Sequence, residues 1–455
     1  MPKGLRDCQR LADKEIKQNM NISMHMCHGL VECGRSQSPG GPSRFAPEFG
    51  KILGPSPTRP APLALLKNPE LIDQTVEIIE SFTDEFEDDV ETLRAKVRVL
   101  LRLLKTSSAV VAYTGAGIST AAGVLDYATA EDSDVAVRTP GTVTMGSSME
   151  GAPPKLRSPY EAQPTMMHRV LVALWRHKLL SCWVQQNHDG LPQKAGFPQW
   201  LLNEIHGSWY DPSNPVIPMT GELRGDLFQD LLELQTRADT VLAFGTSLAG
   251  MNADRLAQGA AERHQKSVAD GSSAGGGLAI CSLQRTQYDH LASIRFWAKL
   301  DSLAELIVQE FELSDLAPAS GPSGETSRAT YPVEAFVDNL KLLEERTVDK
   351  ENDIYLVPYS RTGARLENHE SLRPDQLCRL DLSEDAEVQL TQGQYAGDTG
   401  EVVGKQLEGH WKIRFQHPLK PGARLKRPFE RILGTWWVAA AIMGKVPQIP
   451  VVNVV

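Results

Sequence analysis

The chain has 455 residues, which is enough for about two to three domains. It is 41% hydrophobic and 23% charged, so we expect a soluble, core-forming protein, and its formal net charge of −10 argues against polyanion binding by the chain as a whole. Its six cysteines form no C-x-x-C pair, which excludes a disulfide framework or a zinc ribbon readable from spacing.

The N-terminal part, residues 1–66, is expected to be mostly irregular, because residues 34–64 are dense in Gly, Pro and Ser. Its first residues, "MPKGLRDCQRLADKEIKQ", lack the apolar segment of a secretory signal. No apolar run approaches the roughly 18 residues of a membrane span. We therefore predict a protein that is neither secreted nor embedded in a membrane.

Residues 67–312 are predicted to form the main domain. The acidic stretch "TDEFEDDVE" is interpreted as the solvated start of a helix, where its charges suit the helix dipole. Apolar residues then recur at helical spacing and predict a helix with one apolar stripe: Leu93, Val97, Leu100, Leu101 and Leu104.

Beyond that helix, short apolar runs alternate with helical patterns. Nearly continuous apolar runs predict strands covered on both faces, at 109–114, 179–185, 240–244 and 278–283. Helical spacing is found between them, in "TMMHRVLVALWRHK" and "DLFQDLLELQTRA". The alternation predicts an α/β fold, a Rossmann-like parallel sheet with helices on both faces, whose ligands bind beyond the carboxyl ends of the strands.

Small and polar residues follow these strands directly. After the first strand, glycines let the backbone turn tightly and approach a phosphate, although a plain packing turn explains the pattern equally well. Amide and acid groups emerge together after the second strand, where side chains enter the crevice, and the hydroxyls after the third strand suit a phosphate or ribose. The candidates are Gly115, Ala116, Gly117, Ser119, Gln186, Asn187, Asp189, Gly245, Thr246 and Ser247, with His206 shortly after.

With these motifs in order, roughly residues 92–310 resemble the sirtuins, which are NAD-dependent protein deacylases. The similarity rests on "YTGAGISTAAGVLDY", "PTMMH", "QNHDGLPQKAG", "EIHGS", "TGELRGD", "ADTVLAFGTSL" and "LQRTQYDHLASIRFWAKLDSLAEL". The helix before the first strand and the "LQRTQYD" region look most like the nuclear branch of the family. The resemblance implies NAD as cofactor, an acylated protein lysine such as a histone lysine as substrate, and a place in the nucleus, on chromatin, or in the cytoplasm.

The resemblance also implies roles for residues. The glycine loop and Thr246-Ser247 would hold the pyrophosphate and adenosine side of NAD, and Gln186, Asn187 and Asp189 would line the ribose and nicotinamide pocket. His206 stands where sirtuins keep their general base, a task that suits an imidazole titrating near neutrality. Asn187 and Asp189 would complete the catalytic set with His206. Asp126 and Tyr127, after the glycine loop, would contact the nicotinamide side.

Several departures from the family pattern bear on activity. Ala128 stands where sirtuins carry an arginine, and Ser282 replaces an asparagine that contacts adenosine. Sirtuins place two C-x-x-C pairs between the HG and GE motifs, whereas here only "SWYDPSNPVIPMT" separates them, without a cysteine. We therefore expect a largely deleted zinc-binding lobe, no metal ligands, and a reshaped wall of the acyl-lysine channel.

Residues 313–332 read as a linker, and 333–455 as a separate C-terminal region. Alternating apolar and polar residues around glycine turns, at about 384–434, predict a small antiparallel barrel-like module with a weak KOW or SH3 resemblance. A basic stretch follows and is either a solvated face or a nucleic-acid or protein contact: Lys420, Arg424, Lys426, Arg427 and Arg431. "TWWVAAAIM" is too short for a membrane span and is expected to pack internally.

The leading functional hypothesis is NAD-dependent protein-lysine deacylation, with the acyl group transferred to ADP-ribose and nicotinamide released. Two alternatives stay open at this point. The first is a catalytically inactive protein that binds NAD or ADP-ribose, which the alanine at 128 and the missing lobe favour. The second is an interaction scaffold that acts through the C-terminal β module.

Overall fold

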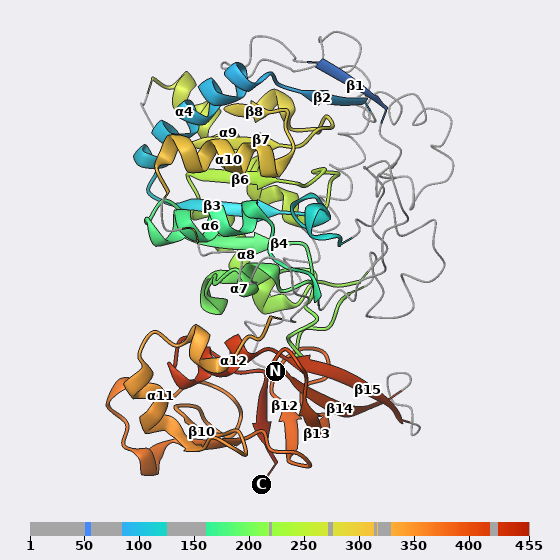
Figure 1. The fold of residues 1–455 in the computed structure, drawn as a ribbon, viewed down its shortest axis with the longest axis vertical. Helices are drawn as coiled ribbons and strands as arrows, with labels where there is room; N and C mark the ends of the chain where they lie inside the picture. Colours follow the sequence, from blue (N-terminus) through green and yellow to red (C-terminus); the bar gives the residue numbers. More distant parts are fainter. Residues whose placement is uncertain are drawn as a thin grey trace.

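The computed structural model describes residues 51–55, 84–124, 161–217, 221–271, 276–313, 316, 329–418 and 426–454. Figure 1 shows an α/β body and, below it, a smaller β-rich body at the C-terminal end of the chain. The predictions for Asp126, Tyr127 and Ala128 lie outside the described residues. So do those for Lys420 and Arg424.

The α/β body is built on a six-stranded sheet in the order β5-β4-β3-β6-β7-β8, and every neighbouring pair is parallel. Its strands are β3 (Val110–Thr114), β4 (Cys182–Gln185), β5 (Leu202–Glu204), β6 (Thr240–Phe244), β7 (Gly277–Cys281) and β8 (Ile294–Phe296). The predicted Rossmann-like sheet and its four predicted strands are confirmed. β5 and β8 were not predicted, because three residues are too few to show a pattern.

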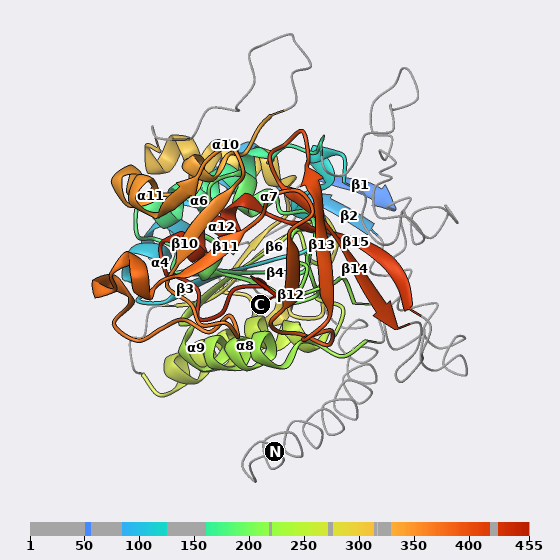
Figure 2. The same cartoon turned by 90° about the horizontal axis from the view of Figure 1, so that it is seen from below.

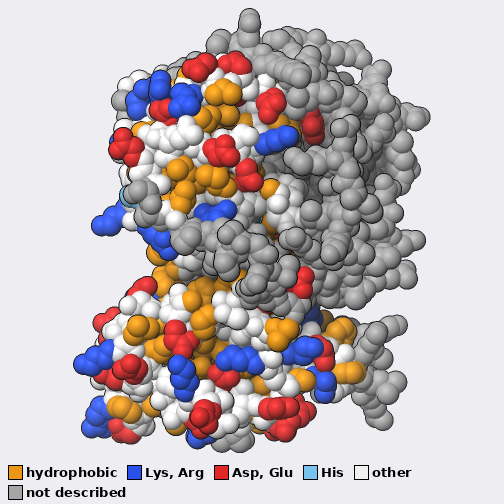
Figure 3. All heavy atoms as spheres, viewed as in Figure 1, with side chains coloured by type: hydrophobic (Ala, Val, Ile, Leu, Met, Phe, Trp, Pro, Cys, Tyr) orange, Lys and Arg blue, Asp and Glu red, His pale blue; other side chains and the backbone are white. Residues whose placement is uncertain are grey.

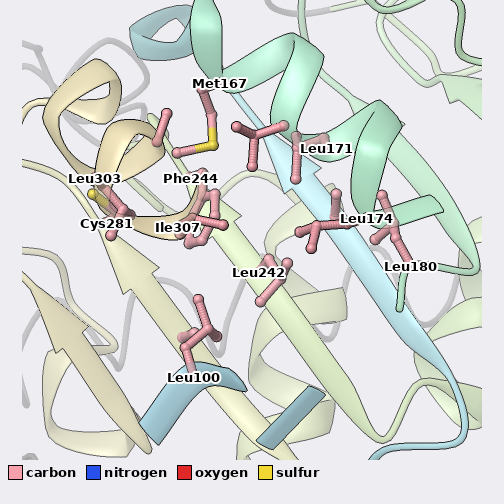
Figure 4. Packing of buried hydrophobic residues seen from close by; sticks show 14 of the residues in the cluster. Leu100, Met167, Leu171, Leu174, Leu180, Leu242, Phe244, Cys281, Leu303 and Ile307 are labelled. Atoms are coloured by element: carbon pink, nitrogen blue, oxygen red, sulfur yellow. The ribbon is translucent and has the colours of Figure 1, made fainter. Parts of the chain in front are cut away.

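Helices cover both faces of this sheet, as predicted. On one face lie α4 (Val90–Thr106), α6 (Met166–Arg176) and α10 (Leu300–Phe311), and on the other α8 (Gly225–Arg237) and α9 (Arg255–Ala269). Side chains of β3 alternate between the two resulting cores, with Val110 and Ala112 in the first and Val111 and Tyr113 in the second. Figure 4 shows the first core, where leucines of α6 and α10 meet Leu242 and Phe244 of β6.

The acidic stretch was predicted as a solvated helix start, and only its end, at Asp89 and Glu91, fits that prediction. Residues Asp84–Glu87 form strand β2, which pairs with β1 (Lys51–Pro55), so a strand also lies inside the segment predicted to be mostly irregular. The next acid, Asp88, is buried and accepts hydrogen bonds of 2.6 and 2.7 Å from the Lys96 ammonium. Asp89 caps the helix, where its carboxylate accepts the Thr92 backbone N–H, and Glu91 lies in the first turn.

The C-terminal module, which we define as residues 329–454, contains two antiparallel sheets rather than one closed barrel. The five-stranded sheet joins β12 (Glu387–Leu390), β13 (Thr399–Lys405), β14 (Trp411–Pro418), β15 (Lys426–Leu433) and β16 (Val451–Asn453). The other joins β9 (Thr347–Asp349), β10 (Ile354–Val357) and β11 (Cys378–Asp381). The module also holds α11 (Leu340–Arg346) and α12 (Thr435–Ile442). Every side chain of α12 is buried, which confirms the predicted packing role of "TWWVAAAIM".

Charge on the C-terminal module is mixed. Lys412 and Arg414 of β14 both pair with Glu430 of β15, at 3.0 and 3.2 Å. Figure 3 shows basic and acidic side chains interspersed on the face of the module that it presents. Among the described helices, none is long and apolar enough to cross a membrane.

Candidate functional site

The strand order places a crevice at the carboxyl ends of β3 and β6. From β3 the chain builds outward through β4 and β5 on one side and then returns to add β6, β7 and β8 on the other. Neighbouring loops leave in opposite directions at such a point, and open α/β sheets bind their ligands there. The loops that follow β3 and β6 begin at Gly115 and Gly245, so the two predicted small-residue turns meet at this crevice.

The glycines let these two loops touch. A Cβ on Gly115 would lie 2.9 Å from the Gly245 carbonyl oxygen, and one on Gly117 would lie 2.8 Å from the Gly245 Cα. The backbone N–H of Gly117 donates to that same carbonyl, at 2.8 Å. A side chain at either position would push the loops apart, so packing already requires both glycines. Two 3₁₀ turns follow, Ala116–Ile118 and Thr120–Ala122.

The residues after β4 close around the same loop. The Asn187 side-chain amide donates to the Gly115 carbonyl at 3.1 Å and to the Ser119 hydroxyl at 2.9 Å. Ser119 in turn donates to the Asp189 carboxylate at 2.6 Å. Asp189 is only 1% exposed and also accepts the Leu191 backbone N–H at 3.0 Å. Asp189 therefore holds the loop in shape, and the structure brings it together with Asn187 and Ser119.

The third predicted group joins from β6. The Gln186 side-chain amide donates to the Thr246 hydroxyl at 2.9 Å, which links the ends of β4 and β6 across β3. Thr246 is buried and also accepts the Leu248 backbone N–H, whereas Ser247 beside it is exposed. Beneath this loop the buried Tyr113 hydroxyl donates to Asp254 at 2.8 Å.

His206 follows β5 directly, on a tight turn. The neighbouring Gly207 has a φ of +98°, and a Cβ on it would lie 2.5 Å from the Pro215 carbonyl oxygen, so glycine is required there. The His206 carbonyl accepts the Ile217 backbone N–H at 3.2 Å. Burial, and then the neighbouring His188, lower the pKa of His206 to about 4. Its imidazole is therefore neutral at pH 7, the form that can accept a proton.

Two further groups, His188 and Glu204, were not predicted from the sequence. His188 lies with its Nδ1 2.9 Å from the Gly207 carbonyl oxygen; since a carbonyl only accepts, Nδ1 carries the proton and Nε2 is the acceptor. Glu204, two residues before His206, is buried, and burial raises the pKa of its carboxyl to about 7. The histidine in "QNHDG" was visible as a signal, but nothing in the sequence indicated that Glu204 is buried.

At the far end of the crevice, Ser282 follows β7. Its hydroxyl donates to the Gln284 carbonyl at 2.6 Å and lies 3.1 Å from the Arg295 guanidinium. Arg295 is itself buried and bound to Asp289 at 2.9 Å. Ser282 is therefore engaged within the fold.

No metal-binding constellation is found among the described residues: no group of three or more His, Cys, Asp or Glu side chains could hold an ion. The described cysteines, Cys182, Cys281 and Cys378, are free thiols. The segment after Gly207, where sirtuins carry their zinc lobe, instead runs beneath the C-terminal module.

Comparison with known proteins gives consistent results for this region. The Sir2 family model matches residues 115–214, which contain the glycine loop, the residues after β4 and His206. The "NAD-dependent protein deacetylase sirtuin-7" of Rattus norvegicus is 30% identical over 276 residues, which cover 50% of this chain and 63% of that protein. An "NAD-dependent protein deacetylase" of Saccharolobus solfataricus is 27% identical over 254 residues, covering 46% of this chain and 89% of that protein.

The chain thus spans less than two thirds of the length of the sirtuin-7 relatives that it matches. Among solved structures, "Sir2 bound to acetylated peptide" covers 48% of this chain and 99% of its own, with a TM-score of 0.37 and 20% identity.

Proposed function

Because residues 115–214 match the Sir2 family model, we propose that the chain is a sirtuin-type, NAD-dependent protein-lysine deacylase whose base is His206. The observation that carries the proposal is the convergence of three loops at one crevice. The loops after β3, β4 and β6 meet there through the Asn187–Ser119–Asp189 and Gln186–Thr246 hydrogen bonds. His206 lies just beyond the adjoining strand, β5. The residue before it, Ile205, donates its backbone N–H to the Gln185 carbonyl of β4.

The donors at the crevice fit a dinucleotide. Hydroxyl and amide groups of Thr246, Ser247 and Gln186 suit phosphate and ribose oxygens, and glycines keep the neighbouring backbone free of side chains. Asn187 would orient the nicotinamide end, with Asp189 holding its loop in place. When bound, NAD supplies the ribose carbon to which the acyl oxygen is transferred as nicotinamide leaves.

The task of His206 is to take a proton from a ribose hydroxyl. Its neutral imidazole has the capacity to do so at pH 7, and its half-buried position limits competing water. The turn at Gly207 and the bond to Ile217 fix the backbone on either side of the ring. A weakly basic imidazole gains basicity when negative charge arrives beside it, because a nearby anion favours its protonated form.

The substrate we propose is an acylated lysine of a protein, and a histone tail is the first peptide to test. A nuclear location, on chromatin, rests on the resemblance to the nuclear branch of the family. For the C-terminal module we propose protein contact rather than nucleic-acid binding, because Lys412 and Arg414 both already pair with Glu430. We retain 67–312 as the catalytic domain and 333–455 as the second unit.

The test compares the full chain with its His206→Ala variant. NAD binding is measured by calorimetry, and peptide deacetylation by mass spectrometry. We expect NAD affinity within about twofold in the two proteins and product only from the parent, because the base acts in the chemical step and not in holding the cofactor. Equal turnover of the two proteins would remove His206 from the mechanism. NAD binding by the parent without any product would leave only the inactive, nucleotide-binding alternative.

A further inference from the structure

The segment that follows His206-Gly207 is a polar loop that is almost entirely buried. We call residues 208–214 the docking segment. Tyr210 is 0% exposed, and Ser208, Asp211, Ser213 and Asn214 are each 4% exposed or less. Loops of this composition ordinarily lie at the surface, so another part of the molecule must cover this one.

The C-terminal module provides the cover. The Tyr210 ring lies 4.9 Å from the rings of both His410 and Trp436, and the Gly434 backbone N–H donates to the Tyr210 carbonyl at 2.9 Å. Figure 1 shows the module below α7 (Leu191–Lys194), and Figure 2 views the molecule from the module's side.

A second contact reaches the other end of the docking segment. Gly393, in the loop between β12 and β13, approaches the Ser213 carbonyl so closely that a Cβ on it would lie 2.1 Å from that oxygen. Contact at this distance is possible only with glycine. The module therefore touches the docking segment at both Tyr210 and Ser213.

A buried lysine fastens the module to the loop after β4. Lys194, at the end of α7, has a side chain that is 0% exposed, and its ammonium lies 3.6 Å from Glu408 of the module. The rings of Tyr210 and Tyr331 lie 5.4 and 5.3 Å from the same ammonium. Tyr331 also donates to Gln163 of the α/β body at 2.9 Å. Because the ammonium is enclosed by a carboxylate and two aromatic rings, these contacts fix the position of the module relative to α7.

The docking segment in turn holds the turn that carries His206. The Ser208 backbone N–H donates to the Asn214 carbonyl at 2.8 Å, and the Asn214 side chain donates to the Glu204 carbonyl at 2.9 Å. The segment therefore closes on itself and binds back to the strand that ends two residues before His206.

We propose that the C-terminal module is a structural part of the reaction site, which takes over the task of the missing lobe by holding the docking segment and, through it, His206. Module residues such as Gly393 are then positioning residues, since the described contacts of Gly393, His410 and Gly434 are with the docking segment. The proposal rests on the deacylase function for its effect on turnover. Its structural half, the fixing of His206 by the module, stands without that function.

A matched pair of glycines in one loop provides the test. Gly393→Ala inserts a methyl group against Ser213, and its φ of +80° adds backbone strain. Gly397→Ala adds the same strain at a φ of +93° but meets nothing within 4 Å. Tyr331→Phe is a milder third variant, which removes only the hydrogen bond to Gln163 and keeps the ring.

Three measurements on the full chain are informative: amide hydrogen exchange over residues 204–217, the His206 pKa by NMR titration, and turnover at saturating NAD and acetyl-peptide. For Gly393→Ala we expect exchange at least tenfold faster, a His206 pKa moved upward toward its ordinary value, and turnover lowered at least tenfold. NAD affinity should stay within about twofold. Gly397→Ala should match the parent, and Tyr331→Phe should shift exchange in the same direction by a smaller factor.

The readouts separate this proposal from the deacylase function. If the parent produces no deacetylated peptide, the proposed function fails, while exchange and the His206 pKa still decide the positioning role. If Gly393→Ala does not fold, Tyr331→Phe against Gly397→Ala decides it. Exchange and a His206 pKa that are the same in the folded variants as in the parent would overturn the proposal.

Discussion

The buried carboxyl of Glu204 gives a direct test of the electrostatics at the end of β5. Glu204 is 3% exposed, and burial raises the pKa of its carboxyl from 4.5 to about 7. The side-chain amide of Gln185 donates to it at 3.1 Å, and no cation is among the causes of its shift. Replacing it with glutamine keeps the shape and removes the titration.

The size of the effect follows from the two pKa values. One pKa unit corresponds to about 1.4 kcal/mol, so ionising Glu204 costs about 3 kcal/mol more in the folded protein than in the unfolded chain. Because the folded-state pKa is the higher one, the stabilisation from the neutral carboxyl is fully present below pH 4.5. It is lost as the pH rises through about 7.

The assay is urea unfolding of parent and Glu204→Gln, followed by tryptophan fluorescence between pH 5 and pH 8. Other groups, including His206, titrate in both proteins, so the difference between the two stability curves isolates Glu204. We expect the variant to gain about 2–3 kcal/mol relative to the parent between pH 5 and pH 8. Glu401→Gln, at an exposed position on β13, is the control and should give a flat difference. A flat difference for Glu204→Gln as well would refute the assigned burial of this carboxyl.

Two further substitutions test the contacts around the site. Lys194→Ala should destabilise the protein by about 3–5 kcal/mol in urea unfolding, because it removes the buried cation that faces the Glu408 carboxylate. Lys412→Ala, at a partly exposed pair, should change stability by less than about 1 kcal/mol, and similar losses in the two variants would contradict the burial of the Lys194 pair. His188→Phe removes the hydrogen bond of about 1 kcal/mol between the His188 ring and the Gly207 carbonyl. It should lower peptide turnover about 2- to 10-fold with unchanged NAD affinity. Parent-like kinetics would exclude a role of His188 in holding the turn at Gly207.

The sequence predicted the sheet well because its four longer strands are continuous apolar runs. Both faces of these strands are buried and nearly all their residues are apolar, with the buried polar residues Thr114, Gln185 and Thr240 at strand ends, so the pattern and the environment agree. It missed β5 and β8, whose three residues gain their structure from the neighbouring strands rather than from local preference. Asp88 was wrongly predicted to be solvated. A buried acid and a solvated acid cannot be distinguished in a sequence, and only the structure shows that Asp88 pairs with Lys96.

The candidate residues were found because each directly follows a strand. Parallel strands bring their ends to one edge, so Gly115, Asn187 and Thr246 could be expected to meet before any contact was known. The purpose of the glycines was open: the structure shows that packing against Gly245 already requires them. The docking of the C-terminal module on Tyr210 could not be predicted, because nothing local in a sequence encodes contact between residues some 200 positions apart.

The most direct test of the proposed chemistry is the stoichiometry of nicotinamide and deacetylated peptide. The full chain is incubated with NAD and an acetylated histone-tail peptide, and both products are quantified in the same reaction. The proposed function predicts that the two products appear one for one, and that neither appears with His206→Ala at the parent's rate. Nicotinamide released without deacetylated peptide, or no release of either with NAD bound, would contradict it.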